Sequence, residues 1–302
     1  MSQLGLVTVL FKADDVLEGF FESLSIQNFK DYHLYLVDNS PNEGTDKLIQ
    51  TLSAKFGVTN YTHVKNAGNE GVARGNNIGI ELSVKDGTTH TVLLNNDIEF
   101  SQPDLLSDML RYAIEHNEPM IVPKIYFHDN RKVWMAGGEF LLYKGLTTHV
   151  GEGDNDGTKY SREAYFDYAP TCFMLIDNKV FEKAGLMDEK YFVYYDDTDF
   201  IFRTNKLGYK IKLLPNLHIY HKVSSITGGK TTLFSIYYGT RNRIYFIRKN
   251  LSGLQYFCSM GFTLFARLLR YLQFDKEQKA KLVTGLKDGF KLNPAGTSPL
   301  KP

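Results

Sequence analysis

The chain has 302 residues, of which 43% are hydrophobic and 23% charged, and its net charge is +1. This composition supports a sizeable core and excludes a disordered chain, and the length allows one large domain or two modest ones. The two cysteines, Cys172 and Cys258, are too few for a disulfide framework or a cysteine-rich metal knuckle. Because the sequence shows no leader pattern and no run of 18 apolar residues, it predicts a cytoplasmic protein.

The first hundred residues alternate between strand and helix patterns. Strands are expected at residues 4–11, 33–38, 58–63 and 91–94, and helices around residues 17–24, 48–56 and 78–82. This alternation predicts an α/β fold with a doubly wound, mostly parallel sheet. Right-handed crossovers would place the carboxyl ends of the strands on one rim, where open α/β sheets bind their ligands.

Polar residues follow the predicted strands at this rim. Asp97 ends the run Asn95-Asn96-Asp97, and a carboxylate there suits a divalent cation that bridges to phosphate. Asp38 can accept hydrogen bonds from a ribose, and Arg74, in a glycine-rich stretch expected to be a loop, can pair with phosphate. Each of these residues can equally be a turn former or a solvated side chain. A G-x-G-x-x-G motif does not follow the first strand, which excludes the usual NAD-binding site.

The second half places Asp196, Asp197 and Asp199 within four residues. They are expected in the first turn of a helix, where the helix dipole favours acids, with Arg203 pairing to Asp199 four residues on. The alternative is an ordinary capped, solvated helix start.

Two aromatic residues complete the candidates in this half. Trp134 is expected in a hairpin over residues 134–139, either stacking on a sugar or lying in the core. His221 follows a strand-like run, with His218 as a weaker candidate, and a neutral imidazole suits Mn²⁺. A lone histidine beside a strand is more often structural.

Charge is divided unevenly along the chain. Residues 222–302 contain 14 Lys/Arg and 3 Asp/Glu, which leaves 21 and 31 for residues 1–221. The sequence therefore predicts a catalytic domain over 1–221 and a basic, aromatic-rich helical region with a tail over 222–302. Apolar residues between 254 and 272 recur at helical spacing, which fits either peripheral contact with an anionic membrane or a homo-oligomer. Nucleic-acid binding is not expected, because the bases sit among apolar helical positions.

Together the motifs resemble the family 2 glycosyltransferases of the GT-A fold, and most of all the bacterial rhamnosyltransferase and galactofuranosyltransferase group. The resemblance runs in consistent order through residues 7–11, 37–40, 66–79, 93–97, 169–176, 185–189, 194–203, 208–209, 219–221 and 237–243. It implies a nucleotide-sugar half over residues 1–100 and an acceptor half over 101–221.

The resemblance also implies roles for single residues. Asp197 would be the catalytic base, Asp196 and Trp134 would bind the acceptor, and Asp97 and His221 would hold Mn²⁺ or Mg²⁺. The donor would contact Thr8, Phe11, Asp38, Asn66, Arg74, Asn76, Asn95, Asn96 and Asp97. Asn95 departs from the family's D-x-D motif: it can still bind ribose but adds no charge, so metal binding would depend on Asp97 and a second ligand.

The expected activity is metal-dependent, inverting transfer of a sugar to a glycan or lipid-linked glycan in cell-surface polysaccharide (O-antigen type) synthesis. The favoured donor is dTDP-L-rhamnose and the next is UDP-galactofuranose, and the site of action would be the inner face of the cytoplasmic membrane. One alternative is a sugar-phosphate nucleotidyltransferase, although Lys12 is the one basic residue after the first strand. The other is a non-catalytic membrane-associated scaffold, which Asn95 would favour.

Overall fold

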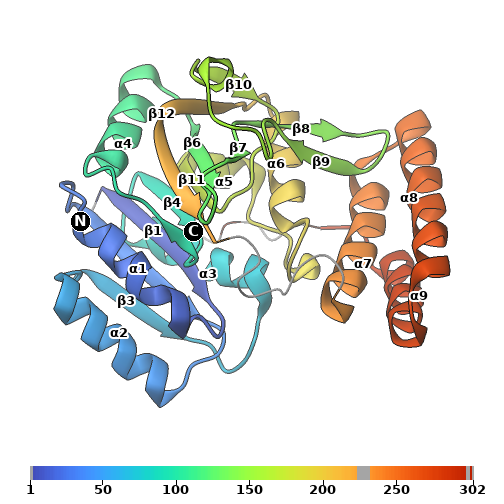
Figure 1. Ribbon diagram of the computed structural model, residues 1–302, viewed down its shortest axis with the longest axis horizontal. Coiled ribbons are helices and arrows are strands. Elements are labelled where there is room, and N and C mark those ends of the chain that lie inside the picture. The colour runs from blue at the N-terminus through green and yellow to red at the C-terminus, as the bar shows by residue number, and fades with distance from the viewer. Residues whose placement is uncertain (1–2, 223–231, 297–299, 301–302) are drawn as a thin grey trace.

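The computed structural model describes residues 3–222, 232–296 and 300, and it has one large mixed sheet between two layers of helices (Figure 1). The strands are β1 (Leu4–Leu10), β2 (Tyr32–Asp38), β3 (Tyr61–Lys65), β4 (His90–Leu94), β5 (Ile98–Glu99), β6 (Met120–Phe127), β7 (Val133–Met135), β8 (Gly138–Leu141), β9 (Leu146–His149), β10 (Ala164–Phe166), β11 (Phe173–Asp177) and β12 (Ile211–His221). The helices are α1 (Asp14–Ser25), α2 (Glu43–Phe56), α3 (Gly71–Lys85), α4 (Leu105–His116), α5 (Asn178–Ala184), α6 (Asp196–Lys206), α7 (Leu233–Asn250), α8 (Gly253–Gln273) and α9 (Lys276–Lys291).

The sheet has the order β10-β12-β6-β11-β4-β1-β2-β3, with β5 paired to β12 and β7 to β6. Strands β4, β1, β2 and β3 run parallel, as the alternating pattern predicted. Strand β11 runs antiparallel between β4 and β6, and β12 runs parallel to β6. The predicted α/β fold with a mostly parallel sheet and a C-terminal helical segment is therefore confirmed.

The third strand begins later than the sequence predicted, at Tyr61 instead of residue 58. Gly57 ends α2 in the left-handed conformation, with φ of 66°, and the amide of Val58 then donates to the carbonyl of Ser53. The apolar side chain of Val58 is thus buried at the end of a helix. An apolar residue read as the start of a strand belongs instead to the helix terminus.

The glycine-rich stretch after β3 is helical from Gly71 onward, although its composition predicted a loop up to Asn77. A Cβ on Gly75 would come within 2.7 Å of Val9, and one on Gly79 within 2.2 Å of Val7. Helix α3 therefore packs directly on β1 through a face without side chains. Arg74 and Asn76 accordingly lie on a helix and not on a flexible loop.

The hairpin predicted over residues 134–139 does not form. Trp134 lies in β7, which pairs with β6, and the hairpin is built instead by β8 and β9. Gly137 separates β7 from β8 with φ of 102°, a conformation that side chains rarely adopt, so the chain turns away from the expected register.

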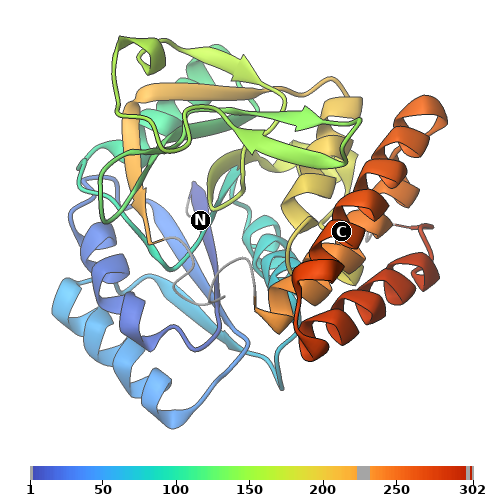
Figure 2. The same ribbon diagram turned by 45° about the vertical axis from the view of Figure 1, so that its right-hand side comes forward.

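The three C-terminal helices stand together at one side of the sheet (Figures 1 and 2). On α7, Ile244 and Phe246 share a small hydrophobic cluster with Tyr191, just before α6, and Phe202 of α6. Helices α8 and α9 form the outer edge of the molecule on this side (Figure 1). Within the described residues, no helix is long and apolar enough to cross a membrane. The predicted division at residue 222 stays a prediction.

Candidate active site

The carboxyl ends of the parallel strands converge on one rim and are tied to one another by backbone hydrogen bonds. The amide of Asn39 donates to Leu10 at 2.8 Å, and the amide of Asn66 donates to Asp38 at 2.9 Å. The side chain of Asn66 also donates to that of Asn39 at 2.8 Å. The buried carboxylate of Asp38 accepts from the amide of Ser40 and lies 3.2 Å from a ring nitrogen of His63. This rim is the one that the strand pattern predicted.

The turn after β4 gives its three polar residues different positions. Asn95 is exposed, whereas Asn96 is buried and donates its side-chain amide to the carbonyl of Val9 at 2.7 Å. Asn96 thereby fixes the turn to the neighbouring strand. Asp97 is also buried and begins the step into β5. The predicted donor contacts of Asn95 and Asn96 stay predictions.

Strand pairing brings Asp97 to His221 across 124 residues of sequence. Strand β5 pairs with the end of β12, with Ile98 opposite His221, so Oδ1 of Asp97 lies 3.1 Å from Nε2 of His221. The other ring nitrogen of His221 is buried and has no hydrogen-bond partner within the described residues. His218 stands three residues earlier on β12 and therefore faces the opposite side of the strand.

The Asp97–His221 pair fits a divalent cation. Two ligands on adjacent corners of an octahedron with bonds of about 2.1 Å are about 3 Å apart, which matches the observed separation. Within the described part of the chain, no group of three His, Cys, Asp or Glu side chains converges as a complete protein-made site. Two protein ligands leave coordination positions for phosphate oxygens and water, as is usual when the ligand is a nucleotide.

Aromatic and imidazole rings connect this pair to the second carboxylate cluster. The ring of Trp134 meets the rings of His221 and His149 edge to face, with centroids 4.7 and 4.5 Å apart. His149 in turn stacks on Tyr168, whose hydroxyl donates to Asp197 at 2.9 Å. Burial lowers the pKa of His149 and so favours its neutral form. Asp97 and Asp197 thus lie at the two ends of one continuous site.

The start of α6 carries the second cluster, as predicted. Asp196 is buried and Asp197 half-buried, and Asp197 also accepts a hydrogen bond from the amide of Thr198 at 2.6 Å. Burial, reinforced by the neighbouring charge of Asp197, raises the pKa of Asp196 to about 8. Burial also raises the pKa of Asp197, against the opposing effect of the hydroxyl of Tyr168. A carboxylate with a raised pKa is a better proton acceptor than one in water.

The segment leading into α6 has an unusual backbone. Phe192, Tyr194 and Tyr195 have φ values of 67°, 62° and 66°, and such sparsely populated backbone conformations cost about 1–3 kcal/mol each. Asn242 of α7 holds this segment: its side-chain amide donates to the carbonyls of Tyr191, Val193 and Tyr194 at 2.7–2.9 Å. The position of Asp196 and Asp197 therefore depends on a contact from α7.

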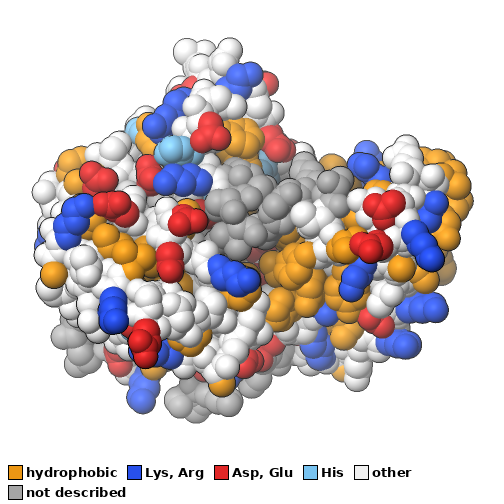
Figure 3. Space-filling view, turned by 60° about the horizontal axis from the view of Figure 1, so that its bottom comes forward, with side chains coloured by type: hydrophobic (Ala, Val, Ile, Leu, Met, Phe, Trp, Pro, Cys, Tyr) orange, Lys and Arg blue, Asp and Glu red, His pale blue; other side chains and the backbone are white. Residues whose placement is uncertain are grey.

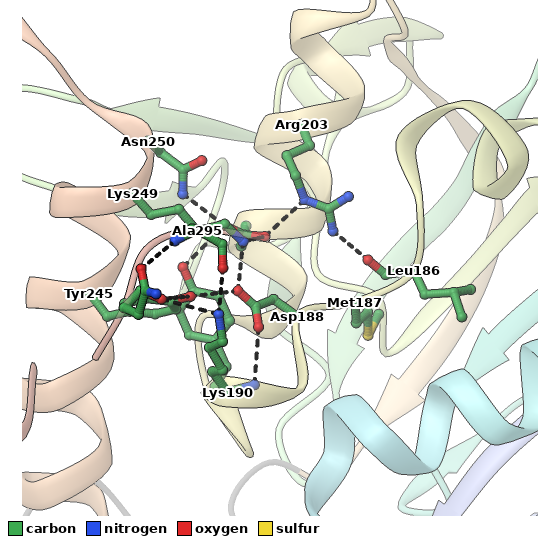
Figure 4. A network of polar contacts seen from close by, with 12 residues as sticks. Leu186, Met187, Asp188, Lys190, Arg203, Tyr245, Lys249, Asn250 and Ala295 are labelled. Atoms are coloured by element: carbon green, nitrogen blue, oxygen red, sulfur yellow. Dashed lines mark hydrogen bonds and ion pairs between the residues drawn. The ribbon is translucent and has the colours of Figure 1, made fainter. Parts of the chain in front are cut away.

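A buried network fixes α6 against α7 (Figure 4). The carboxylate of Asp199 accepts a hydrogen bond from the guanidinium of Arg203 at 2.9 Å, which confirms the predicted pairing four residues apart. It also accepts from the ammonium of Lys249 at 2.9 Å and from the side-chain amide of Asn250 at 2.7 Å. Lys249 donates to Asp188 as well, at 2.8 Å. Burial pushes the pKa of Asp199 upward, but Arg203 and Lys249 outweigh burial and hold that pKa below its usual value.

The remaining predicted donor residues lie around α3 and β1. Arg74 already pairs with Glu189 at 3.0 Å, and the amide of Asn76 points at the sulfur of Met187. Thr8 is fully buried, and Phe11 is half-buried with the ammonium of Lys12 over its ring. The donor contacts of these residues and of Asp38 and Asn66, and the acceptor contacts of Trp134 and Asp196, stay predictions.

Four residues of the site were not among the sequence candidates: His63, His149, Tyr168 and Asn242. His149 and Tyr168 sit in short segments without a motif, so their place depends on the β8–β9 hairpin. Asn242 lies in the resembling stretch 237–243, which was the one signal that pointed to it.

Two curated proteins are similar in sequence to this chain over most of its length. The low-salt glycan biosynthesis hexosyltransferase Agl10 of Haloferax volcanii is 23% identical over 266 residues, which cover 85% of this chain and 80% of that protein. The dTDP-rhamnosyl transferase RfbF of Shigella flexneri is 25% identical over 237 residues, or 74% of each chain.

Solved structures share the fold. Residues 1–349 of S. aureus TarS in complex with UDP superpose with a TM-score of 0.62 at 13% identity, covering 96% of this chain and 80% of that one. The mannosyltransferase PcManGT from Pyrobaculum calidifontis, in complex with GDP-Man and Mn²⁺, gives a TM-score of 0.58 at 11% identity, covering 94% and 79%.

The family model described as glycosyl transferase family 2 matches residues 6–185. This range includes the whole rim of parallel strand ends, the Asn95–Asp97 turn, His149 and Tyr168. Because the match covers more than half of the 302 residues, the chain belongs to glycosyl transferase family 2 and has its GT-A fold.

Proposed function

We propose that the protein is an inverting, metal-dependent glycosyltransferase that moves a sugar from a nucleoside diphosphate to a hydroxyl of a glycan or lipid-linked glycan. The observation that carries this proposal is the continuous site with Asp97 and His221 at one end and Asp197 at the other. The first end suits a diphosphate with its cation, and the second suits an acceptor hydroxyl. The rings of Trp134 and His149 connect the two ends.

The donor would lie along the rim formed by β1–β4. Its base and ribose would contact Asp38, Asn66 and Asn95, and its diphosphate would reach Asp97. A cation held by Asp97 and His221 would neutralise charge on the departing diphosphate. L-rhamnose carried by dTDP is the favoured donor, because RfbF is named a dTDP-rhamnosyl transferase, and UDP-galactofuranose is the next.

The reaction would be a single displacement. The acceptor hydroxyl transfers its proton to Asp197 while its oxygen attacks the anomeric carbon, and the bond from that carbon to the diphosphate oxygen breaks. One displacement inverts the anomeric configuration, and no enzyme nucleophile is required. The hydroxyl of Tyr168 and the amide of Thr198 hold the Asp197 carboxylate in place. Trp134 and Asp196 would orient the acceptor.

The proposed setting is the cytoplasm at the inner face of the membrane, in the synthesis of a cell-surface polysaccharide. A lipid-linked acceptor would be presented there, and the exposed apolar side chains of α8 support a peripheral position.

Calorimetric titration of dTDP, UDP and GDP, in Mn²⁺ and in EDTA, tests the donor end. One of these nucleotides should bind in Mn²⁺, and binding should weaken at least ~10-fold in EDTA and in Asp97→Asn. Asp129→Asn is the matched control, because the side chain of Asp129 is 96% exposed. Failure of all three nucleotides to bind in Mn²⁺ would refute the proposal.

Transfer assays with the bound donor test the acceptor end. Asp197→Asn should bind the donor with unchanged affinity and lose roughly 10²–10⁴-fold in turnover, the range for a general base. Nucleoside diphosphate should be the released product. Release of pyrophosphate would instead favour a nucleotidyltransferase, and an intact donor across a broad acceptor panel would favour a scaffold.

A further inference from the structure

Helix α8 exposes a continuous apolar face. Its large side chains there lie at the outer side of the molecule, where hydrophobic atoms gather at the right edge of the space-filling view (Figure 3). We call this face the α8 stripe. Its most exposed members are Leu254 (69%), Phe257 (71%), Phe265 (60%), Leu268 (57%) and Leu272 (69%).

The stripe follows the helical repeat along the whole helix. Leu254, Phe257, Phe265, Leu268 and Leu272 are spaced by multiples of a helical turn and share one side. The opposite side packs inward, with Ser259, Met260 and Thr263 buried. Helix α8 contains no acidic residue, and the guanidinium of Arg267 turns inward to the carbonyl of Gly239 at 3.2 Å. The stripe itself therefore carries no charge.

Lysines flank the stripe on both sides. The ammonium of Lys144, from the β8–β9 turn, lies 5.6 Å from the ring of Phe262. The ammonium of Lys279, from α9, lies 5.4 Å from the ring of Tyr271. Phe262 and Tyr271 are nine residues apart, which places them on opposite edges of the stripe. An uncharged centre with lysines along both edges is the pattern of a helix lying in a membrane interface.

The charges beside the stripe argue against self-association through this face. Lys144 and Lys279 stand at its two edges. Two copies meeting stripe to stripe would bring these lysines of both copies together, and their like charges would repel. Anionic lipid headgroups would instead neutralise the same lysines while the acyl boundary covers the apolar side chains.

We propose that α8 docks flat on an anionic membrane surface, with the stripe in the headgroup–acyl boundary and the flanking lysines at the phosphates. The helix lies on the membrane and does not cross it, in keeping with its hydropathy. The hydroxyl of Ser259 on α8 donates to the carbonyl of Leu142, at the end of the β8–β9 hairpin whose other end carries His149. Docking would therefore hold the acceptor end of the site close to the lipid; this last step rests on the proposed function.

Vesicle co-sedimentation of the full chain tests the docking without donor or acceptor, so its result is independent of catalysis. Wild type should bind vesicles of phosphatidylcholine with 30% phosphatidylglycerol at least ten times more tightly than phosphatidylcholine alone. The difference should shrink at 0.5 M NaCl. The variant Phe257→Ser/Leu268→Ser/Leu272→Ser should lose at least tenfold in binding.

The matched control is Ile26→Ser/Ile114→Ser/Leu207→Ser, which removes three exposed apolar side chains outside α8 and should bind like wild type. Circular dichroism verifies that both variants are folded. Equal binding to both vesicle types, or full binding by the stripe variant, would overturn the proposal. So would a wild-type dimer in sedimentation velocity that the stripe variant alone converts to a monomer, with no vesicle binding.

Discussion

Helices α7 and α8 follow one another in the chain and differ in what they contact. Helix α7 turns Asn242, Lys249 and its buried apolar residues toward α6 and the segment before it. The side chain of Asn242 donates to backbone carbonyls of that segment, and Lys249 donates to the carboxylate of Asp199. Helix α8 turns its largest apolar side chains toward solvent and buries Ser259, Met260 and Thr263.

The difference shows that the basic C-terminal region is not one functional unit. Helix α7 completes the catalytic part, because the positive-φ segment before Asp196 is held from α7. Helix α8 exposes its outer apolar face, the face proposed above to dock on a membrane. Changes in α7 should therefore affect stability and turnover, whereas changes on the outer face of α8 should affect neither.

The largest effect is expected from Lys249→Met. This change leaves the buried carboxylates of Asp188 and Asp199 without their shared cation, and removal of one partner from a buried ion pair costs about 3–5 kcal/mol. Urea unfolding monitored by circular dichroism measures the loss. Lys206→Met, at the solvent-facing end of α6, is the control and should change stability by less than about 0.5 kcal/mol. An equal loss of unfolding free energy in the two variants would contradict the claim that the buried contacts of α7 matter more than those of surface residues.

Asn242→Ala should come next, with a drop in kcat of about 10–100-fold, because a misplaced catalytic group costs on that order. Its donor affinity should stay unchanged, since the hydrogen bonds that Asn39 and Asn66 make at the rim involve no residue of α7. Calorimetry for the donor and steady-state kinetics for transfer separate the two quantities. A variant that loses donor affinity and kcat together would indicate general unfolding and not loss of positioning.

The segment that α7 holds should also make stability depend on pH. The folded-state pKa of Asp196, about 8, lies above its ordinary value of 3.8, so the folded protein keeps a proton that the unfolded chain releases between these values. Stability should therefore fall as pH rises from about 4 towards 8. Asp196→Asn should flatten this slope by up to about 1.4 kcal/mol per pH unit, the limit for one proton. Unfolding titrations in EDTA at several pH values measure it, and an unchanged slope would contradict the prediction.

The smallest effect is expected from Phe265→Ser on α8. Its ring is 60% exposed, so the free energy of unfolding should change by less than about 0.5 kcal/mol. Ile244→Ala on α7 is the contrasting change, because a fully buried isoleucine costs about 2–5 kcal/mol when truncated. A large loss from Phe265→Ser would mean that α8 is covered within the protein itself.

Local patterns predicted the parts of the fold that local physics determines. The apolar runs of β1, β2 and β4 and the buried face of α1 are confirmed, as is the Asp199–Arg203 pair at the start of α6. Each depends on periodicity or on contacts within one helical turn. The rim of strand ends also followed, since parallel strands joined by right-handed crossovers leave their carboxyl ends on one side.

The errors and omissions come from contacts between distant segments. The glycine content of α3 predicts a loop. Those glycines are needed because α3 packs so closely on β1 that a Cβ at Gly75 or Gly79 would collide with Val9 or Val7. The pairing of Asp97 with His221 depends on β5 meeting β12, and two residues of strand give no periodic signal. The β8–β9 hairpin places His149 and Tyr168 at the site. The composition of residues 134–139 predicted the hairpin at the wrong position in the chain, so these two residues were missed.

The contacts of Asn242 also bear on how the protein is made. The carbonyls that it holds are synthesised 48–51 residues before Asn242 itself. Domains generally fold as units during translation, so this segment has no contact with Asn242 until α7 leaves the ribosome. The nascent chain should thus gain the fixed position of Asp196 and Asp197 late in synthesis. Ribosome-arrested chains ending before and after residue 250 would differ in this way, the shorter ones exposing the α6 start to protease and the longer ones protecting it.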